Sequence, residues 1–534
     1  MSEALSSTLA NGERQRTIER LREGTFDVLI IGGGINGAGI ARDAAMRGMR
    51  VALVEKGDFA SGTSSKSSKL IHGGVRYLQQ GDFRLVWVAC RERDLLRRRL
   101  APHLVEPLAF IFPVYRGDPV GFFTLGVGMW LYDALATFRN IKAHKMMSAK
   151  RAQRVEPQLR STGLRGAALY YDCWTDDARL TLETVLDARE EGAVAANYIE
   201  LKAFIKENGR IVGAVAQDRF GGPPIEIKAR SVVNAAGPWV DLVRQLDDPA
   251  ADACLRLTKG VHIVVPRERV GNVHAVVMHS PRDRRVLFVI PWGQHDIIGT
   301  TDTDFEGAPD TVAADQSDVD YLLESTNWFF PAARLTTADV ISAYAGLRPL
   351  VASTNAKDPS AVSREEAILE SRSGLLTLAG GKLTTYRFVA QEIVDRVAKR
   401  LGMLGRRRGR HLTAGKPLPG GRGTKPNQIV DELVARNGSG LSRQQVEHLV
   451  GRYGSRTPQV IELIEGQSDL GRPIVPSLPD LWAEAAYAVR IEMAVDAEDV
   501  LMRRTKVGLQ DPEEAAQVAD LVRQRLPFFR DDAD

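Results

Sequence analysis

The stretch Phe26–Gly57, FDVLIIGGGINGAGIARDAAMRGMRVALVEKG, decides the fold. Its opening run Phe26–Ile31 is apolar and β-branched, the pattern of a strand that is covered on both faces. Ile35–Gly48 carries small apolar side chains at helical spacing, and Arg50–Val54 is a second apolar run. The pattern therefore predicts a strand, a helix and a second strand, a unit that needs about 30 residues.

Three glycines occupy the turn between the first strand and the helix. Gly32, Gly34 and Gly37 have the spacing G-x-G-x-x-G, which permits a tight turn, close approach of the backbone to a pyrophosphate, and close helix packing. The phosphates would face the N–H groups of the helix N-terminus. Glu55 follows about 20 residues later, where a carboxylate can bind a ribose 2′-hydroxyl and would repel a 2′-phosphate. We therefore predict a dinucleotide site rather than a glycine-rich turn without a ligand.

Length and composition limit the class of protein. The 534 residues are too many for one core, so two or three domains are expected. With 44% apolar residues and a formal net charge of +4, the chain gives no indication of nucleic-acid binding. Its three scattered cysteines favour a reducing compartment over a disulfide framework or a metal cluster.

Two segments bear on localisation. The first 24 residues are polar and lack the apolar core of a secretory signal, and no run of about 20 uncharged apolar residues predicts a spanning helix. Pro119–Phe138 is apolar and aromatic, is interrupted by Asp133, and is followed by several cations. It suits either a buried helix or a segment in the plane of a membrane interface, and both interpretations stay open.

Later motifs repeat the opening pattern. Arg230–Val240 is a buried strand that ends in small residues, and Leu375–Arg387 is again a strand, a glycine turn and a helix. Residues 255–301 are rich in strand patterns, and everything beyond residue 427 has helical patterns. This order predicts a discontinuous nucleotide-binding domain, an inserted substrate domain and a helical C-terminal domain.

These motifs, in this order, resemble those of the FAD-dependent glycerol-3-phosphate dehydrogenase family, within the D-amino-acid-oxidase-like flavoprotein superfamily. The resemblance runs from about Phe26 to the end of the chain. The motifs that carry it are IGGGINGAGIARDAAMRG, TSSKSSKLIHGGVRYL, YDCWTDDARL, NAAGPWV, KGVHIVVP, FVIPWG, IIGTTDTD, AGLRPL, AGGKLTTYR and LMRRTKVGL. The first is shared by many flavoproteins, whereas SSKLIHGGVRYL together with AGGKLTTYR is far more specific.

The resemblance implies an α/β fold with a Rossmann-like FAD-binding domain, an inserted antiparallel-sheet substrate domain and an all-helical C-terminal domain. The predicted boundaries are 1–24 for a polar N-terminal tail; 25–110, 165–250 and 345–403 for the discontinuous FAD-binding domain; 111–164 and 251–344 for the substrate-binding domain; 404–427 for a linker; and 428–534 for the helical domain. The tail lies outside the resemblance, and we assign it no role.

The resemblance also implies the reaction. FAD would oxidise sn-glycerol 3-phosphate to dihydroxyacetone phosphate by hydride transfer from C2 to flavin N5. The electrons would pass to a membrane quinone, from a protein attached peripherally to the cytoplasmic face of the cell membrane. An oxygen-reducing oxidase that produces hydrogen peroxide is the alternative, and a flavin-binding protein without turnover is another. No nucleic acid is expected as a partner, and the oligomeric state stays open, with a homodimer among the options.

The residues expected to contact FAD come from several turns. They are Gly32, Gly34, Gly37, Glu55, Ser64, Ser65, Ser67, Gly237, Gly380, Gly381, Lys382, Leu383 and Thr384. Within this set the resemblance assigns the pyrophosphate to the first three glycines and the adenosine ribose to Glu55, and it places the serines on the flavin side.

Oxidation of an alcohol by flavin needs a base for the hydroxyl proton. His72 is the leading candidate, because imidazole titrates near neutral pH. It can instead orient the flavin or satisfy a buried backbone group. His262 is the alternative base, although a structural role inside its alternating strand is equally compatible. Tyr77 is a further candidate for substrate contact.

The substrate dianion and the reduced flavin both need positive charge nearby. Arg76 and Arg348 are the candidates for the phosphate, since a guanidinium offers two parallel donors to its oxygens. His72 and Arg76 would share one face if their segment is helical. Arg348 lies in an apolar stretch, where a buried charge needs a partner. Lys382 follows two glycines before a helix, which suits either the flavin edge or the phosphate.

Three aspartates, Asp172, Asp176 and Asp177, invite interpretation as a metal site. Hard cations need several converging oxygens, and the spacing of a calcium-binding loop is missing here. Helix capping by Asp176 or Asp177 is the simpler explanation. No metal is therefore expected.

Overall fold

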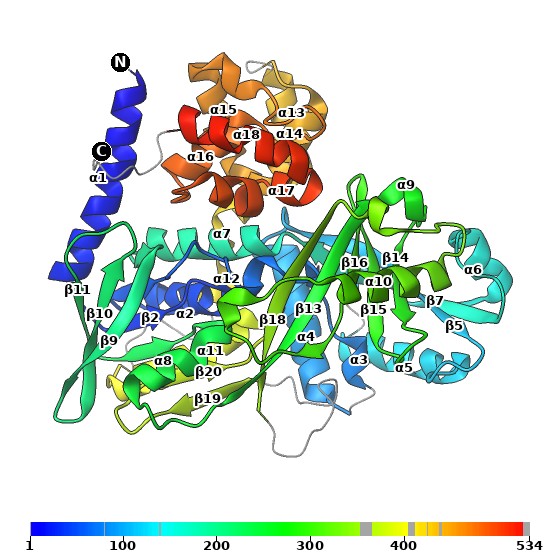
Figure 1. The fold of residues 1–534 in the computed structure, drawn as a ribbon, viewed down its shortest axis with the longest axis horizontal. Helices are drawn as coiled ribbons and strands as arrows, with labels where there is room; N and C mark the ends of the chain where they lie inside the picture. The colour runs from blue at the N-terminus through cyan, green and yellow to red at the C-terminus, as the bar shows by residue number, and fades with distance from the viewer. Residues whose placement is uncertain are drawn as a thin grey trace.

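A computed structural model describes residues 2–78, 81–137, 140–352, 366–403, 412–423, 425–436 and 440–526, with the side chains of residues 2–11 and of Arg76 outside the description. Three sheets lie beneath a helical C-terminal domain (Figure 1).

A six-stranded sheet forms the centre of the cofactor domain. Its order is β19-β20-β12-β2-β3-β8, and only β19 runs antiparallel to its neighbour. The strands are β2 (Val28–Ile31), β3 (Val51–Val54), β8 (Val194–Ala196), β12 (Val232–Asn234), β19 (Ala367–Glu370) and β20 (Leu376–Ala379). The predicted strand–helix–strand unit is thus confirmed as β2, α2 (Ile35–Met46) and β3.

Alternating side chains of β2 pack into two different cores. Val28 and Ile30 face the helices α2, α7 (Asp177–Glu190) and α11 (Tyr386–Arg400). Leu29 and Ile31 face a four-stranded sheet on the opposite side. That sheet has the order β1-β11-β10-β9, from Thr25–Phe26, Ile225–Ala229, Arg210–Asp218 and Ile199–Glu207. Coverage on both faces explains why the strand has no polar residue.

A ten-stranded sheet forms the substrate domain, and most of its pairings are antiparallel. Its members are β4 (Leu70–Ile71), β5 (Val105–Tyr115), β6 (Lys145–Ser148), β7 (Leu164–Thr175), β13 (Leu255–Pro266), β14 (Ala275–His279), β15 (Val286–Trp292), β16 (His295–Gly299), β17 (Thr303–Asp304) and β18 (Ser342–Val351). The helices beside it are α3 (Val75–Leu78), α4 (Phe83–Leu95), α5 (Phe122–Leu135), α6 (Ala149–Val155), α9 (Arg267–Val270) and α10 (Gln316–Phe329).

Three strands correct the predicted domain boundaries. β5 and β7 pair along their whole length, and β18 pairs with β13, so all three belong wholly to the ten-stranded sheet. The predicted limits divided β5 at residue 111, assigned nearly all of β7 to the cofactor domain, and divided β18 at residue 345. Sequence periodicity identifies a strand, but the pairing partner that decides its domain is distant in the chain.

The two ends of the chain are helical. α1 (Ser2–Glu23), in the segment predicted as a polar tail, buries Ile18 and Leu21 against β8 and β11. The C-terminal helices are α13 (Pro426–Arg436), α14 (Arg443–Tyr453), α15 (Thr457–Gly466), α16 (Trp482–Arg490), α17 (Val507–Gln510) and α18 (Pro512–Arg525). In the predicted linker, residues 404–411 and 424 lie outside the described residues, while Leu418 and Pro419 are buried.

Candidate active site

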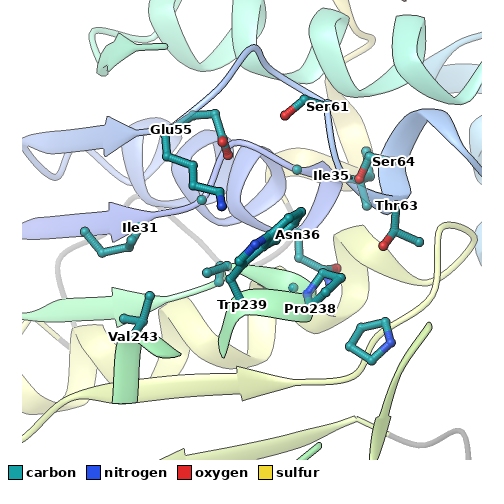
Figure 2. A pocket seen from close by; sticks show the side chains of 18 of the residues that line it. Ile31, Ile35, Asn36, Glu55, Ser61, Thr63, Ser64, Pro238, Trp239 and Val243 are labelled. Carbon is teal, nitrogen blue, oxygen red and sulfur yellow. Dashed lines mark hydrogen bonds between the residues drawn. The ribbon is translucent and has the colours of Figure 1, made fainter. Parts of the chain in front are cut away.

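Two cavities meet beside the carboxyl ends of β2 and β3. The first, of about 630 Å³, is lined by the glycine turn after β2, the loop after β3 and the turn at residues 380–383. Figure 2 shows Asn36, Glu55 and Trp239 around it. We call it the cofactor cavity, because ligands of open α/β sheets bind beyond the carboxyl ends of the strands.

The second cavity, of about 510 Å³, lies between this turn region and the ten-stranded sheet. It brings together the predicted residues His72, Tyr77, His262, Arg348 and Lys382, and we call it the substrate cavity. The two cavities share the lining residues Thr63, Ser67, Lys382 and Leu383. A flat ring at this junction would therefore contact both cavities.

The glycine turn has no space for side chains. Gly32 has φ +110, and a Cβ added there would lie 2.6 Å from the carbonyl oxygen of Ala235. A Cβ on Gly37 would overlap the carbonyl oxygen of Gly32, so Gly37 serves helix packing and does not line the cavity. Gly34 lines the cavity, and its Cβ would meet the Ser64 hydroxyl at 3.1 Å. These three positions fit the roles expected for a dinucleotide turn.

Glu55 lies at the end of β3 and lines the cofactor cavity. Its carboxylate accepts hydrogen bonds from Gly33 N at 2.6 Å and from Gly57 N at 2.9 Å. Burial raises the pKa of this carboxyl. Contact with a ribose stays a prediction, and the bond to Gly33 adds a second role that the sequence did not reveal, because Glu55 also holds the glycine turn.

The three predicted serines have different surroundings. Ser64 lines the cofactor cavity, and its hydroxyl accepts from Ile35 N, at the start of α2, at 3.0 Å. Ser67 lines both cavities and donates to Asp177 at 2.7 Å. Ser65 is buried and lines neither cavity. Its neighbours in the sequence, and not Ser65 itself, face the ligand space.

The turn after β20 borders both cavities. Gly380 and Gly381 have φ +83 and +104, and Gly380, Gly381, Lys382 and Leu383 all line the cofactor cavity, as does Gly237. Lys382 lies four residues before α11, which begins at Tyr386, so it does not sit at a helix N-terminus as predicted. Thr384 lines the substrate cavity.

His72 precedes the short helix α3. Its backbone N–H donates to the Thr384 hydroxyl at 3.2 Å. Its ring stacks on Tyr77 with 6.4 Å between ring centres. His72 lies outside this helix, which begins at Val75, so the condition for placing His72 and Arg76 on one helix face is not met. The side chain of Arg76 lies outside the described residues.

His262 is deeply buried on β13. Its Nε2 lies 2.8 Å from the Ser68 hydroxyl, and its ring stacks on Tyr344 at 4.9 Å. Burial, reinforced by the charges of Arg348 and Lys69, lowers its pKa well below the ordinary value for histidine. The imidazole is therefore neutral near pH 7.

Arg348 on β18 is oriented by neighbours that the sequence interpretation did not include. It donates to Asp302 at 3.0 Å and to the Thr300 hydroxyl at 2.8 Å, and its guanidinium lies over Gly260. Arg285 also lines the substrate cavity and donates to the Asp302 carbonyl. The motif IIGTTDTD was a usable signal, because it places two threonines and an aspartate directly after β16.

The three aspartates considered for a metal each bind a cation of the chain. Asp172 pairs with Arg93, and Asp177 pairs with Lys69 at 2.7 Å. Asp176 pairs with Lys506 and accepts from Arg179 N at 2.8 Å, which confirms it as the N-cap of α7. These partners account for the three carboxylates without a metal.

Comparison with known proteins agrees with this geometry. The family described as FAD dependent oxidoreductase matches residues 27–387, and the family described as C-terminal domain of alpha-glycerophosphate oxidase matches residues 411–526. The chain is 40% identical to glycerol-3-phosphate dehydrogenase of Mycobacterium leprae over 99% of this chain and 90% of that protein. It is 37% identical to aerobic glycerol-3-phosphate dehydrogenase of Staphylococcus saprophyticus, over 93% and 90%.

A solved structure matches over nearly the whole chain. It is the glycerol-3-phosphate dehydrogenase from Bacillus halodurans complexed with FAD, with a TM-score of 0.80 and 35% identity. The match covers 96% of this chain and 92% of that one. FAD is therefore the cofactor of this chain, and its place at the glycine turn and in the cofactor cavity stays a prediction. The chain belongs to the FAD-dependent glycerol-3-phosphate dehydrogenase family.

Proposed function

We propose that this protein oxidises sn-glycerol 3-phosphate to dihydroxyacetone phosphate. The observation that carries the proposal is the shared wall at Lys382, through which a cation-bearing cavity adjoins the cofactor cavity. Such a cavity suits a small phosphorylated alcohol held against the flavin. The relatives named glycerol-3-phosphate dehydrogenase support the same substrate.

The cations of the substrate cavity have separate tasks. Arg348 binds the phosphate, because Asp302 and Thr300 orient its guanidinium in advance and limit the entropy lost on binding. Lys382 places positive charge beside the flavin, where negative charge develops on reduction. Its Nζ lies 5.5 Å from the ring centre of Tyr77, which also lines the substrate cavity.

FAD supplies the hydride acceptor, and the chain supplies the base for the hydroxyl proton. His72 remains our first candidate, because it lines the substrate cavity and its backbone is bonded to Thr384 beside Lys382. His262 is the alternative, since it is neutral and lies near Arg348. Ser68 holds its Nε2, so the proton would pass through that hydroxyl or go to Nδ1.

A quinone is the electron acceptor we propose, and exposed apolar side chains on α4 and α5 support it. The apolar patch consists of Phe83, Trp87, Phe122, Phe123, Val127, Trp130 and Leu131. Within it, Phe123 is 84% exposed and Trp130 is 65% exposed, although no helix in the described ranges is long and apolar enough to cross a bilayer. We propose that this patch lies in the cytoplasmic membrane surface.

The patch also borders the substrate cavity. Val127 and Leu131 are exposed members of the patch, and both line that cavity. A lipid-soluble acceptor could therefore approach the flavin from the membrane side without crossing bulk water. This continuity favours a quinone over oxygen as the acceptor.

Anaerobic titration of the purified holoprotein tests the substrate. Glycerol 3-phosphate should bleach the flavin absorbance stoichiometrically, and glycerol should not, because it lacks the dianion that Arg348 would bind. Unchanged absorbance with glycerol 3-phosphate would contradict the proposal.

A second experiment separates the dehydrogenase from the oxidase. Substrate-reduced protein is mixed in a stopped-flow instrument with oxygen or with a soluble quinone analogue. Faster reoxidation by the quinone is expected, whereas fast reoxidation by oxygen with stoichiometric hydrogen peroxide would establish the oxidase.

A further inference from the structure

The loop between β3 and β4, residues 55–69, contacts the glycine turn and lines both cavities, and we call it the cofactor loop. Glu55 accepts from Gly33 N, and Ala60 N donates to the Gly33 carbonyl at 3.2 Å. Farther along, Thr63 and Ser67 line both cavities. The position of this loop therefore determines the shape of the glycine turn and of the cavity junction.

Irregular backbone makes the loop dependent on external contacts. Ala60 has φ +65 and Lys69 has φ +56, left-handed conformations that cost energy for residues with a Cβ. Such conformations persist only where the surroundings hold them in place. Ala60 follows two residues after Asp58, which forms an ion pair with Arg504. Lys69 itself forms an ion pair with Asp177.

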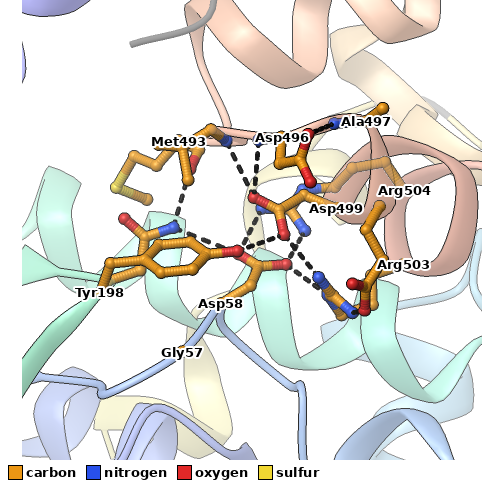
Figure 3. Close-up of polar contacts among 12 residues, drawn as sticks. Gly57, Asp58, Tyr198, Met493, Asp496, Ala497, Asp499, Arg503 and Arg504 are labelled. Carbon is orange, nitrogen blue, oxygen red and sulfur yellow. Dashed lines mark hydrogen bonds and ion pairs between the residues drawn. The ribbon is translucent and has the colours of Figure 1, made fainter. Parts of the chain in front are cut away.

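The first ion pair comes from the C-terminal domain. Arg504 donates to both carboxylate oxygens of Asp58, at 2.6 and 2.9 Å, and Arg503 Nε donates to Asp58 at 2.6 Å (Figure 3). All three side chains are buried. Asp499 receives a second bond from Arg503 and a bond from the Tyr198 hydroxyl at 2.6 Å, so Arg503 joins the carboxylates of Asp58 and Asp499.

The other end of the loop is held through the same C-terminal segment. Lys69 pairs with Asp177, which also accepts from Ser67 N at 3.0 Å. The preceding residue, Asp176, pairs with Lys506. Residues 503–506 thus contact Asp58 directly and reach the Lys69 end through the first turn of α7.

We propose that Arg503, Arg504 and Lys506 are positioning residues, by which the C-terminal domain holds the cofactor loop in its FAD-binding conformation. They touch neither cavity. By holding the loop they would increase the affinity of the protein for FAD, in addition to joining two domains. The proposal concerns FAD alone, so it is independent of the identity of the substrate.

A paired substitution separates positioning from stability. Removing one partner of a buried ion pair destabilises a protein, whereas neutralising both is often tolerated. In Asp58→Asn with Arg504→Met, we expect the FAD dissociation constant of the apoprotein to rise about tenfold or more while the apoprotein melts near its original temperature. An unchanged dissociation constant would overturn the proposal.

The matched control removes a different ion pair of the C-terminal domain, one that lies far from the cofactor loop. Arg456 in the C-terminal domain pairs with Glu190, at the far end of α7, about 20 Å from Asp177 by helix length. Arg456→Met with Glu190→Gln should leave FAD binding unchanged. Loss of affinity of equal size in this control would show that any interdomain ion pair has the effect, and would also overturn the proposal.

Unmodified protein provides a test that does not depend on folding of a variant. Coupling is reciprocal, so FAD must stabilise the C-terminal segment as much as that segment stabilises bound FAD. Adding FAD to the apoprotein should slow amide hydrogen exchange in residues 499–506 and leave 454–456 unaffected. Equal exchange in both states at 499–506 would contradict the positioning role.

Discussion

The guanidinium of Arg348 donates to the carboxylate of Asp302 at 3.0 Å, and both side chains line the substrate cavity. An arginine that already has a carboxylate partner keeps its orientation before the substrate arrives. It can donate to a dianion only through its other N–H groups, so phosphate binding must be directional.

Replacing Arg348 by alanine should weaken binding of glycerol 3-phosphate by one to several kcal/mol, about fivefold or more in KM. The flavin should stay bound, because Arg348 is not among the residues that line the cofactor cavity. Steady-state kinetics with a quinone analogue measures the effect. Arg282→Ala is the control, since Arg282 is an exposed residue paired with Glu324, and an equal KM in Arg348→Ala and the parent would contradict the assignment.

Exchange of each candidate histidine distinguishes the two possible bases. His72→Asn should slow flavin reduction about 10²-fold while FAD remains bound. Under the alternative, His262→Asn produces that loss and His72→Asn does not. Rapid-scan measurement of flavin reduction at saturating substrate compares the two variants directly, and full-speed reduction in both would exclude either histidine as the base.

The opening unit of the fold was predictable because its signals are local. An apolar run, three glycines and a second apolar run determine β2, α2 and β3 within one stretch of sequence. The structure also places His72, His262, Arg348 and Lys382 around one cavity, and their roles there stay predictions.

Long-range contacts were not predictable in the same way. Asp58 and Arg503 are 445 residues apart, and the sequence around neither residue predicts its partner. Ser65 illustrates a smaller failure, because one residue along a tight turn reverses the direction of a side chain, and composition does not record that direction. The domain of β18 was not predicted for the same reason, because its partner strand β13 is also distant in the chain.

The buried neutral state of His262 should make stability depend on pH. Its pKa in the folded chain lies below the ordinary 6.5, so between these values the unfolded chain binds one more proton. The contribution of neutral His262 to the free energy of unfolding is therefore complete above about pH 6.5. It declines as the pH falls, with a slope of at most about 1.4 kcal/mol per pH unit. Chemical denaturation at several pH values should show a shallower slope for His262→Gln than for the parent.

Membrane binding should depend on the apolar patch of α4 and α5. Phe123→Ser with Trp130→Ser removes its two most exposed aromatic side chains, each worth roughly 1.5–3 kcal/mol when buried. Sedimentation with anionic lipid vesicles should show at least about tenfold weaker partitioning. Ile491→Ser with Leu521→Ser removes exposed apolar groups from the C-terminal domain and should partition like the parent; equal partitioning of both double variants would exclude the patch as the membrane surface.

Lys382 should set the reduction potential of the flavin, because it belongs to the walls of both cavities. Reduction places negative charge on the ring system, and a cation fixed nearby stabilises the reduced form more than the oxidised form. Lys382→Met removes that preference, so the midpoint potential should become more negative by about 30 mV or more, equivalent to 1.4 kcal/mol for two electrons. Lys382→Arg keeps the charge and should stay near the parent value in a spectroelectrochemical titration. If the methionine variant kept the parent potential while its KM for glycerol 3-phosphate rose, the lysine would act on the phosphate instead, and the charge beside the flavin would have to come from another group.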